Sequence, residues 1–270
     1  MIDKEQQAEL RAKFNPDGSD LRKMQLRMLE MLKYIDKICR ENDIKYWLSS
    51  GTCLGAIRHG GFIPWDDDVD IEMCKKDYKK LIDILKKQNN DYKLQDHSQD
   101  NEYLAPYAKL RDTKSYLKES NTNDIHYKYR GIYIDIFCIE PSSSLWIFKL
   151  TSIIQYRFIY SLAKIKNNVL RKVLIFLLFP SITKIIYPFF SLLSKYNSNK
   201  WFRHIPGSGF FKRRHRQDFD IILKVPFEDT FLPVPKESDS YLKRLYGESY
   251  MCLPPLDSIK PHISKIMFFE

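Results

Sequence analysis

The sequence predicts an α/β (α+β) fold, in which a mixed sheet forms the core and a helical, basic and aromatic segment is inserted. Helix and strand patterns alternate through residues 20–140, which is typical of a sheet packed against helices. Residues 141–216 then change in composition and hold 14 Lys and Arg but no Asp or Glu. Because the 270-residue chain is 44% hydrophobic, it can build one large domain or a domain with a subdomain.

A long first helix is predicted over residues 20–42, where apolar side chains recur every three or four positions and Ser19 or Asp20 can cap the first turn. Near the other end, "VPFEDTFLPVP" (225–235) predicts a turn with short strands, and "KESDSYLKRLYG" (236–247) predicts a helix that ends at Gly247. Between these segments the patterns predict a strand at 44–48, a helix at 53–59, a Lys-rich helix at 75–88, and strands at 92–97, 104–111, 115–119 and 131–138.

These patterns divide the chain into a core (1–140), the basic aromatic insertion (141–216) and a C-terminal segment that completes the core (217–270). The five cysteines lie far apart with no CxxC pair, which argues against a zinc ribbon or a disulfide framework and favours a reducing compartment. The first 14 residues have no apolar stretch of the secretory type. We therefore expect a cytoplasmic protein.

The stretch "DDDVDIEM" (66–73) concentrates negative charge that must be offset if the chain is to fold compactly. Interpreted as a strand, residues 67–73 place Asp68, Asp70 and Glu72 on one face and apolar residues on the other. Carboxylates two positions apart on a strand can hold a divalent cation, and oxygen-only ligation favours Mg²⁺ (or Mn²⁺) over zinc. An EF-hand loop fits less well because Ile71 replaces the turn glycine, and a solvated acidic loop leaves the apolar alternation unexplained.

The segment "SSGT" (49–52) precedes this acidic stretch and falls between a strand and a short helix. A glycine at a helix start lets backbone N–H groups approach a phosphate. A Gly-Ser/Thr turn, a helix and then Asp-apolar-Asp on a strand is the pattern of the nucleotidyltransferase fold of polymerase-β-like enzymes. That fold usually takes a third carboxylate from a later strand, and "GIYIDIF" (131–137) supplies Asp135. The alternative for Asp135 is an ion pair with a basic residue, since a lone buried carboxylate is costly.

The resemblance extends to a family. The stretch "SSGTCLGAIRHGGFIPWDDDVDIEM" (49–73) resembles the signature of the LicD family, relatives of fukutin. Three later blocks are similar to that family: "YAKLRDTKSYL" (107–117), "YIDIF" (133–137) and "FLPVPKESDSYLKRLYGESYMCLPP" (231–255), with His262 after them. The resemblance covers residues 21–140 and 226–262. The sequence departs from the family pattern at Glu248-Ser249 and at Glu72, where a small or apolar residue is more usual.

The resemblance implies transfer of phosphocholine or a similar alcohol phosphate from a CDP-linked donor such as CDP-choline. The acceptor would be a hydroxyl of a cell-surface glycan of the lipopolysaccharide, teichoic acid or capsule type, and CMP would be released. Asp68 and Asp70 would hold the cation, Asp135 would complete the site, and Asp135 or Asp68 would take the acceptor proton. Two rival functions stay open: a nucleotidyltransferase that releases pyrophosphate, and a basic membrane-binding scaffold with a degenerate site.

Substrate contacts are predicted from the same blocks. Each candidate has a structural alternative: an ion pair for the cations, core packing for Trp65, and a structural hydrogen bond for His59 and His262. Trp65 would stack on a base or a quaternary ammonium. The other predicted contacts are backbone and hydroxyl groups at Ser50, Gly51 and Thr52, and phosphate-binding cations at Arg58, Lys109 and Arg111.

The insertion predicts an anionic membrane surface as a partner. It holds 15 of the 38 aromatic residues, and Lys149, Arg157 and Lys164 share one side of a predicted helix over residues 145–165. A membrane-spanning helix over 173–194 is less expected because prolines and a lysine interrupt it. No nucleic acid is expected, since bulky aliphatics are dense and RNA-binding motifs are missing. We therefore expect docking on the inner membrane face, where a lipid-linked glycan acceptor would be reached.

Overall fold

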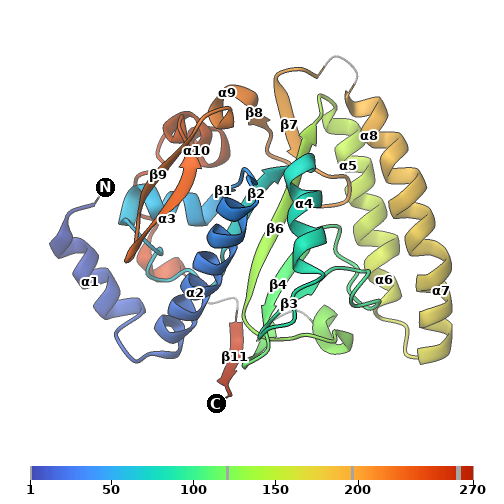
Figure 1. Ribbon diagram of the computed structural model, residues 1–270, viewed down its shortest axis with the longest axis horizontal. Helices are drawn as coiled ribbons and strands as arrows, with labels where there is room; N and C mark the ends of the chain where they lie inside the picture. The colour runs from blue at the N-terminus through green and yellow to red at the C-terminus, as the bar shows by residue number, and fades with distance from the viewer. Residues whose placement is uncertain (1, 120–121, 196–197, 260–262, 270) are drawn as a thin grey trace.

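The computed structural model describes residues 2–119, 122–195, 198–259 and 263–269. Its centre is a mixed sheet in the order β1-β2-β6-β4-β3, formed by Trp47–Leu48, Asp70–Cys74, Tyr133–Pro141, Ala108–Asp112 and Tyr92–Gln95 (Figure 1). β2 and β6 pair in parallel, and the other pairs of this sheet are antiparallel. The predicted α+β class and mixed-sheet core are confirmed.

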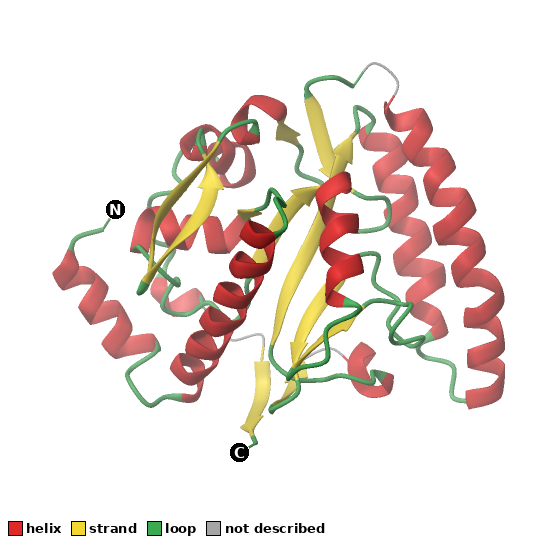
Figure 2. Cartoon of the chain, in the orientation of Figure 1, coloured by secondary structure: helices red, strands yellow, loops and turns green. Residues whose placement is uncertain are grey.

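Two helices, α2 (Asp20–Glu41) and α4 (Lys75–Leu85), cover one face of the sheet (Figure 2). The Ser19 hydroxyl accepts a hydrogen bond from Arg22 N at 3.2 Å and so caps α2, as predicted. The apolar stripe of α2 packs on Ile71, Ile134 and Ile136, which point from β2 and β6 into the same core. This packing fixes which face of each strand is polar, because strand side chains alternate.

The shorter elements around the sheet largely follow the predicted pattern. The N-terminal α1 (Lys4–Phe14) was not predicted, and α3 (Ser50–His59) begins three residues earlier than expected. The C-terminal hairpin and helix are confirmed, and Gly247 ends the helix with φ 90°. The hairpin is formed by β9 (Ile222–Phe227) and β10 (Thr230–Pro235), and the helix is α10 (Ser238–Tyr246). The remaining elements are β5 (Ser115–Glu119), η1 (Thr122–His126), α9 (Arg216–Phe219), η4 (Leu256–Ser258) and β11 (Ile263–Phe268). His262 lies outside the described residues.

The insertion forms two long helical runs beside the sheet (Figure 1). The first joins α5 (Leu145–Ile154), the π turn η2 (Gln155–Ile159) and α6 (Tyr160–Leu162). The second joins α7 (Asn168–Ser181), the π turn η3 (Ile182–Ile186) and α8 (Tyr187–Lys195). The second run continues through the prolines that were expected to interrupt it. A π turn offers the backbone a wider hydrogen-bonding pattern where proline lacks an N–H.

The last part of the insertion belongs to the central sheet, which the sequence patterns did not predict. β7 (Trp201–His204) pairs with residues 139–141 of β6, and β8 (Arg214–His215) pairs with β7. The partner β4 reaches only Ile136 of β6, so the end of this nine-residue strand lies beyond it. β7 satisfies the backbone groups of that end.

Candidate active site

The glycine-containing turn and the acidic stretch meet at the start of β2. Ser49 N donates a hydrogen bond to the Asp70 carbonyl at 2.9 Å, and Asp70 N donates to Thr52 Oγ1 at 2.9 Å. These bonds hold the first turn of α3 against the acidic strand. β2 begins at Asp70, so Asp67 and Asp68 lie in the segment before it rather than in the strand as predicted, and Asp66 lies in that same segment.

Three charged side chains form a row across the sheet. Asp70 on β2 is the register partner of Asp135 on β6, and Asp135 is the register partner of Lys109 on β4. Lys109 Nζ lies 3.0 Å from Asp135 Oδ1. Neighbouring register partners point to one face, so the structure brings Asp135 beside Asp70 across 65 residues of sequence. The sequence alternative, an ion pair for Asp135, is therefore present as well.

The electrostatics of this region favour a bound cation. Burial, together with the charges of Asp68 and Asp135, raises the pKa of Asp70 well above its usual range. Burial and the neighbouring carboxylates also raise the pKa of Asp66. Several carboxylates are thus held together with too little positive charge, and their oxygen-only donor set fits Mg²⁺ or Mn²⁺.

The carboxylates that lie closest to one another differ from the predicted metal-binding set. Oxygens of Asp66, Asp67 and Asp68 all lie within 4.8 Å of one another in the part of the chain that the structure describes. In the predicted set of Asp68, Asp70 and Asp135, the charges of Asp68 and Asp135 both raise the pKa of Asp70. Asp66 was missed as a site residue, although it stands in the same acidic run and faces the predicted phosphate turn.

Ser50 and Gly51 form the beginning of α3, where a phosphate was predicted to bind. Ser50 has a φ of 47°, an uncommon conformation for a residue with a side chain. A Cβ added to Gly51 would lie 3.0 Å from Asp66 Oδ2. Glycine here allows the acidic segment to approach the first turn of the helix closely.

We expect Gly51→Ala to fold but to weaken metal binding and activity. The new methyl group would displace the Asp66 carboxylate by a few tenths of an ångström, while alanine favours the helix by up to about 1 kcal/mol. Thermal melts with and without Mg²⁺, and transfer assays, give the measurement. Lys79→Ala is a control that places an alanine at an exposed position of another helix, α4. Unchanged Mg²⁺ stabilisation of Gly51→Ala would contradict the role of this close approach.

Two of the predicted phosphate-binding cations have other partners. Arg58 is buried; its Nη1 donates to the carbonyl oxygens of Tyr250 and Cys252 at 3.1 and 3.0 Å. Arg111 is also buried, and donates from Nε to Gln95 Oε1 at 2.8 Å and from Nη1 to the Gly131 carbonyl at 2.9 Å. Of the three predicted cations, Lys109 is the one in the row of site carboxylates.

Trp65 packs as part of the apolar core in this structure. Its ring makes edge contacts with Phe14 and His59, at centroid distances of 5.2 and 6.0 Å. Burial and the charge of Arg58 lower the pKa of His59 to about 3, so this imidazole is neutral at pH 7. His59 Nδ1 hydrogen-bonds Gln7 Oε1 at 2.7 Å, so His59 makes the structural hydrogen bond that was the alternative to a substrate contact.

Glu72 shares the polar face of β2 but is enclosed by hydrogen-bond donors. Its carboxylate contacts His204 Nε2 at 2.6 Å, Tyr241 OH at 3.0 Å and Trp47 Nε1 at 3.3 Å, and it also pairs with Arg214. Although burial opposes ionisation, Arg214 and His204 hold the pKa of Glu72 well below its usual range. Glu72 therefore joins β2 to β7, β8 and α10 rather than facing a substrate.

The fold and the site define a class of protein. A glycine-containing turn opens α3, an acidic segment leads into β2, and a further carboxylate comes from the neighbouring parallel strand. This is the arrangement of a nucleotidyltransferase-like domain with a carboxylate site.

Comparison with known proteins places the chain more narrowly. Residues 43–171 match the LicD/FKTN/FKRP nucleotidyltransferase domain, so this part of the chain is a LicD-family domain. It is 28% identical to the lipopolysaccharide cholinephosphotransferase LicD of Haemophilus influenzae, over 90% of this chain and 95% of that protein. It is 37% identical to the mouse ribitol-5-phosphate transferase FKTN over 29% of this chain and 17% of that protein. It is 42% identical to the human ribitol 5-phosphate transferase FKRP over 18% of this chain and 10% of that protein.

Proposed function

We propose that the protein transfers phosphocholine, or a similar alcohol phosphate, from a CDP-linked donor to a hydroxyl of a cell-surface glycan. The observation that carries the proposal is the row of Asp70, Asp135 and Lys109 beside the first turn of α3. The name of the Haemophilus influenzae relative supports phosphocholine as the transferred group, and the names of mouse FKTN and human FKRP support an alcohol phosphate in general.

In the proposed reaction, the acceptor oxygen forms a bond to the distal phosphorus of the donor, and the bond from that phosphorus to the CMP oxygen breaks. The acceptor proton passes to a carboxylate oxygen of Asp135 or Asp68. Asp68, Asp70 and Asp135 would hold Mg²⁺ (or Mn²⁺), which when bound would offset the charge that builds on the donor phosphates. Lys109 holds the Asp135 carboxylate in place, and backbone N–H groups at Ser50 and Gly51 would orient a donor phosphate.

The released product distinguishes this function from its rivals. The protein would be incubated with Mg²⁺, a glycan acceptor and a panel of CDP-alcohols that includes CDP-choline. We expect CMP to be released in proportion to the alcohol phosphate transferred. Pyrophosphate release from CTP, with none from CDP-alcohols, would favour true nucleotidyl transfer instead. Failure to bind Mg²⁺ or any donor would favour the scaffold alternative.

The helical runs of the insertion support a membrane-facing role for this enzyme. Trp146, Val169 and Phe176 are 82%, 74% and 76% exposed, and further large apolar side chains along α5, α7 and α8 are exposed with them. The run Asn168–Lys195 is long and apolar enough to cross a membrane by length and composition alone. We propose interfacial docking, because exposed cations border these apolar side chains and the segment has no acidic residue to repel anionic lipid.

We expect the protein to bind anionic liposomes and to be released only partly by high salt, because apolar burial persists when charges are screened. Changing Lys149, Arg157 and Lys164 together to Glu should weaken this binding strongly, at about 1 kcal/mol for each cation lost near the surface. Liposome flotation at low and high salt measures the effect.

A matched control for that experiment changes three exposed lysines outside the insertion, Lys76, Lys79 and Lys87, to Glu. This control should bind liposomes nearly as well as the wild type. Equal binding to neutral and anionic liposomes, or binding to neither, would leave the segment as a structural subdomain.

A further inference from the structure

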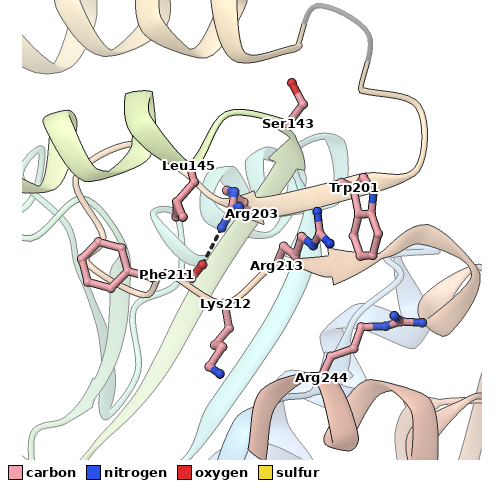
Figure 3. Close-up of a pocket in the computed structure, with 8 residues that line it drawn as sticks. All are labelled: Ser143, Leu145, Trp201, Arg203, Phe211, Lys212, Arg213 and Arg244. Atoms are coloured by element: carbon pink, nitrogen blue, oxygen red, sulfur yellow. Dashed lines mark hydrogen bonds between the residues drawn. The ribbon is translucent and has the colours of Figure 1, made fainter. Parts of the chain in front are cut away.

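A polar cavity lies at the edge of the sheet formed by β7 and β8, with one wall from α10 (Figure 3). Its volume is about 490 Å³, which suits a small ligand. Four cations line it, namely Arg203, Lys212, Arg213 and Arg244, and none of the described residues that line it is acidic. The cavity is therefore suited to an anionic ligand.

Arg203 is the strongest indication of an anion site among these cations, because it is only 4% exposed. Its guanidinium donates from Nη1 to the Phe211 carbonyl, and its Nε has no hydrogen-bond partner among the described residues (Figure 3). No carboxylate of the described chain lies within ion-pair distance of it. Burial and the charges of Arg213 and Arg214 lower the pKa of Arg203, so its positive charge is poorly compensated.

Two of the neighbouring cations, Arg213 and Arg244, are held in place around the same opening. Arg213 stacks on the ring of Trp201, with its guanidinium carbon 3.6 Å from the ring centroid. Arg244 reaches the cavity from α10 and is fixed by Asp218, whose Oδ2 lies 2.8 Å from its Nε. Lys212 and Arg213 are exposed, and neither forms an ion pair within the described residues. Positioned arginines of this kind suit phosphate, which accepts several hydrogen bonds at once.

This cavity is separate from the candidate active site. Arg203 pairs in register with Glu140, five residues beyond Asp135 on β6, a span of about 17 Å at the usual rise of a strand. Trp201 and Arg203 also alternate with His204, which contacts Glu72 on the polar face of β2. They therefore point to the other face of the sheet, away from the carboxylate row.

We propose that this cavity binds a phosphate ester other than the one transferred, carried by a phosphorylated carbohydrate or by a phospholipid headgroup. A phosphate group placed beside Arg203, with Lys212 and Arg213 closing over it, would compensate the buried charge. The site goes beyond the proposed function, because its occupation needs neither a CDP-linked donor nor a metal ion.

Two probes separate the two sources of phosphate. Calorimetric titration with glucose 6-phosphate, and with glucose as the uncharged control, measures binding of a soluble ester. Flotation with phosphatidylcholine vesicles, with and without phosphatidylglycerol, measures binding of a headgroup. We expect the double variant Lys212→Ala/Arg213→Ala to bind one of these phosphate probes at least about tenfold more weakly than the wild type. The control Lys76→Ala/Lys79→Ala loses the same charge from α4 and should bind normally.

Arg203→Gln gives a second test of phosphate binding, and circular dichroism and a thermal melt show whether the variant folds. It should weaken the same probe about tenfold or more, since it removes the buried charge. Loss with glucose 6-phosphate would assign the site to a phosphorylated carbohydrate, and selective loss with anionic vesicles would assign it to a headgroup. Equal binding by wild type, pocket variants and control in both experiments would overturn the proposal.

Discussion

Replacing Asp70 with Asn is expected to reduce transfer by about a thousandfold or more while leaving the metal-free fold at least as stable as the wild type. The loss follows because Asp70 lies between Asp68 and Asp135 and would supply one of the cation's oxygens. The stability follows from the raised pKa of the Asp70 carboxyl, which shows that folding disfavours its charged form. Asp68→Asn is expected to behave in the same way.

The pH dependence of stability gives this prediction a definite sign. A carboxyl whose pKa is raised on folding supports stability below its unfolded pKa, about 3.9, and this support is lost as pH rises through its folded pKa. The Asn variant should therefore match or exceed the wild type at pH 7 and lose that advantage in acid. Thermal melts at several pH values, with and without Mg²⁺, measure both effects.

The control for Asp70→Asn is Asp83→Asn, which removes an exposed carboxylate from α4. It should keep both the activity and the full stabilisation by Mg²⁺. If Mg²⁺ stabilised Asp70→Asn as much as the wild type, Asp70 would not be a metal ligand.

Glu72→Ala is expected to cost about 3–5 kcal/mol of unfolding free energy, because it leaves Arg214 buried without its partner carboxylate. His204, Tyr241 and Trp47 would each lose a hydrogen-bond acceptor as well. Chemical denaturation at pH 7 gives the measurement. The expected loss is large because Glu72 joins strands from the core and the insertion with a helix of the C-terminal segment.

The matched control for Glu72 is Glu9→Ala, which removes an exposed glutamate from α1 and should change stability by less than about 0.5 kcal/mol. A similarly small loss for Glu72→Ala would show that the cluster around it is not important for folding. Glu72→Gln, which keeps the shape of the side chain, should fall between the two variants.

Much of the core could be predicted because local patterns determine it. The spacing of apolar residues predicted α2, and alternation along 67–73 placed Ile71 in the core. The lone Asp135 in an apolar strand predicted a special position, and the parallel register places it beside Asp70. In each case one period, 3.6 or 2, carries the information within a few turns or residues.

The remainder depends on long-range pairing that no local pattern encodes. Residues 201–215 were predicted as part of a helical insertion, but Trp201–His204 completes the exposed end of β6. The partners of Glu72 come from that strand, from β8 and from α10. Its structural role could therefore not be predicted from the residues around it in the sequence. The partners of Arg58, which are carbonyl groups almost 200 residues away, were hidden for the same reason.

The central claim is that one divalent cation site includes carboxylates from both β2 and β6. Crystals of the protein soaked with Mn²⁺, with diffraction collected where Mn²⁺ scatters anomalously, would locate the ion directly. We predict an anomalous peak within ligand distance of Asp70, with Asp135 bound directly or through one water and Asp68 completing the site. A peak held by Asp66, Asp67 and Asp68 alone, with none beside Asp70 and Asp135, would contradict it.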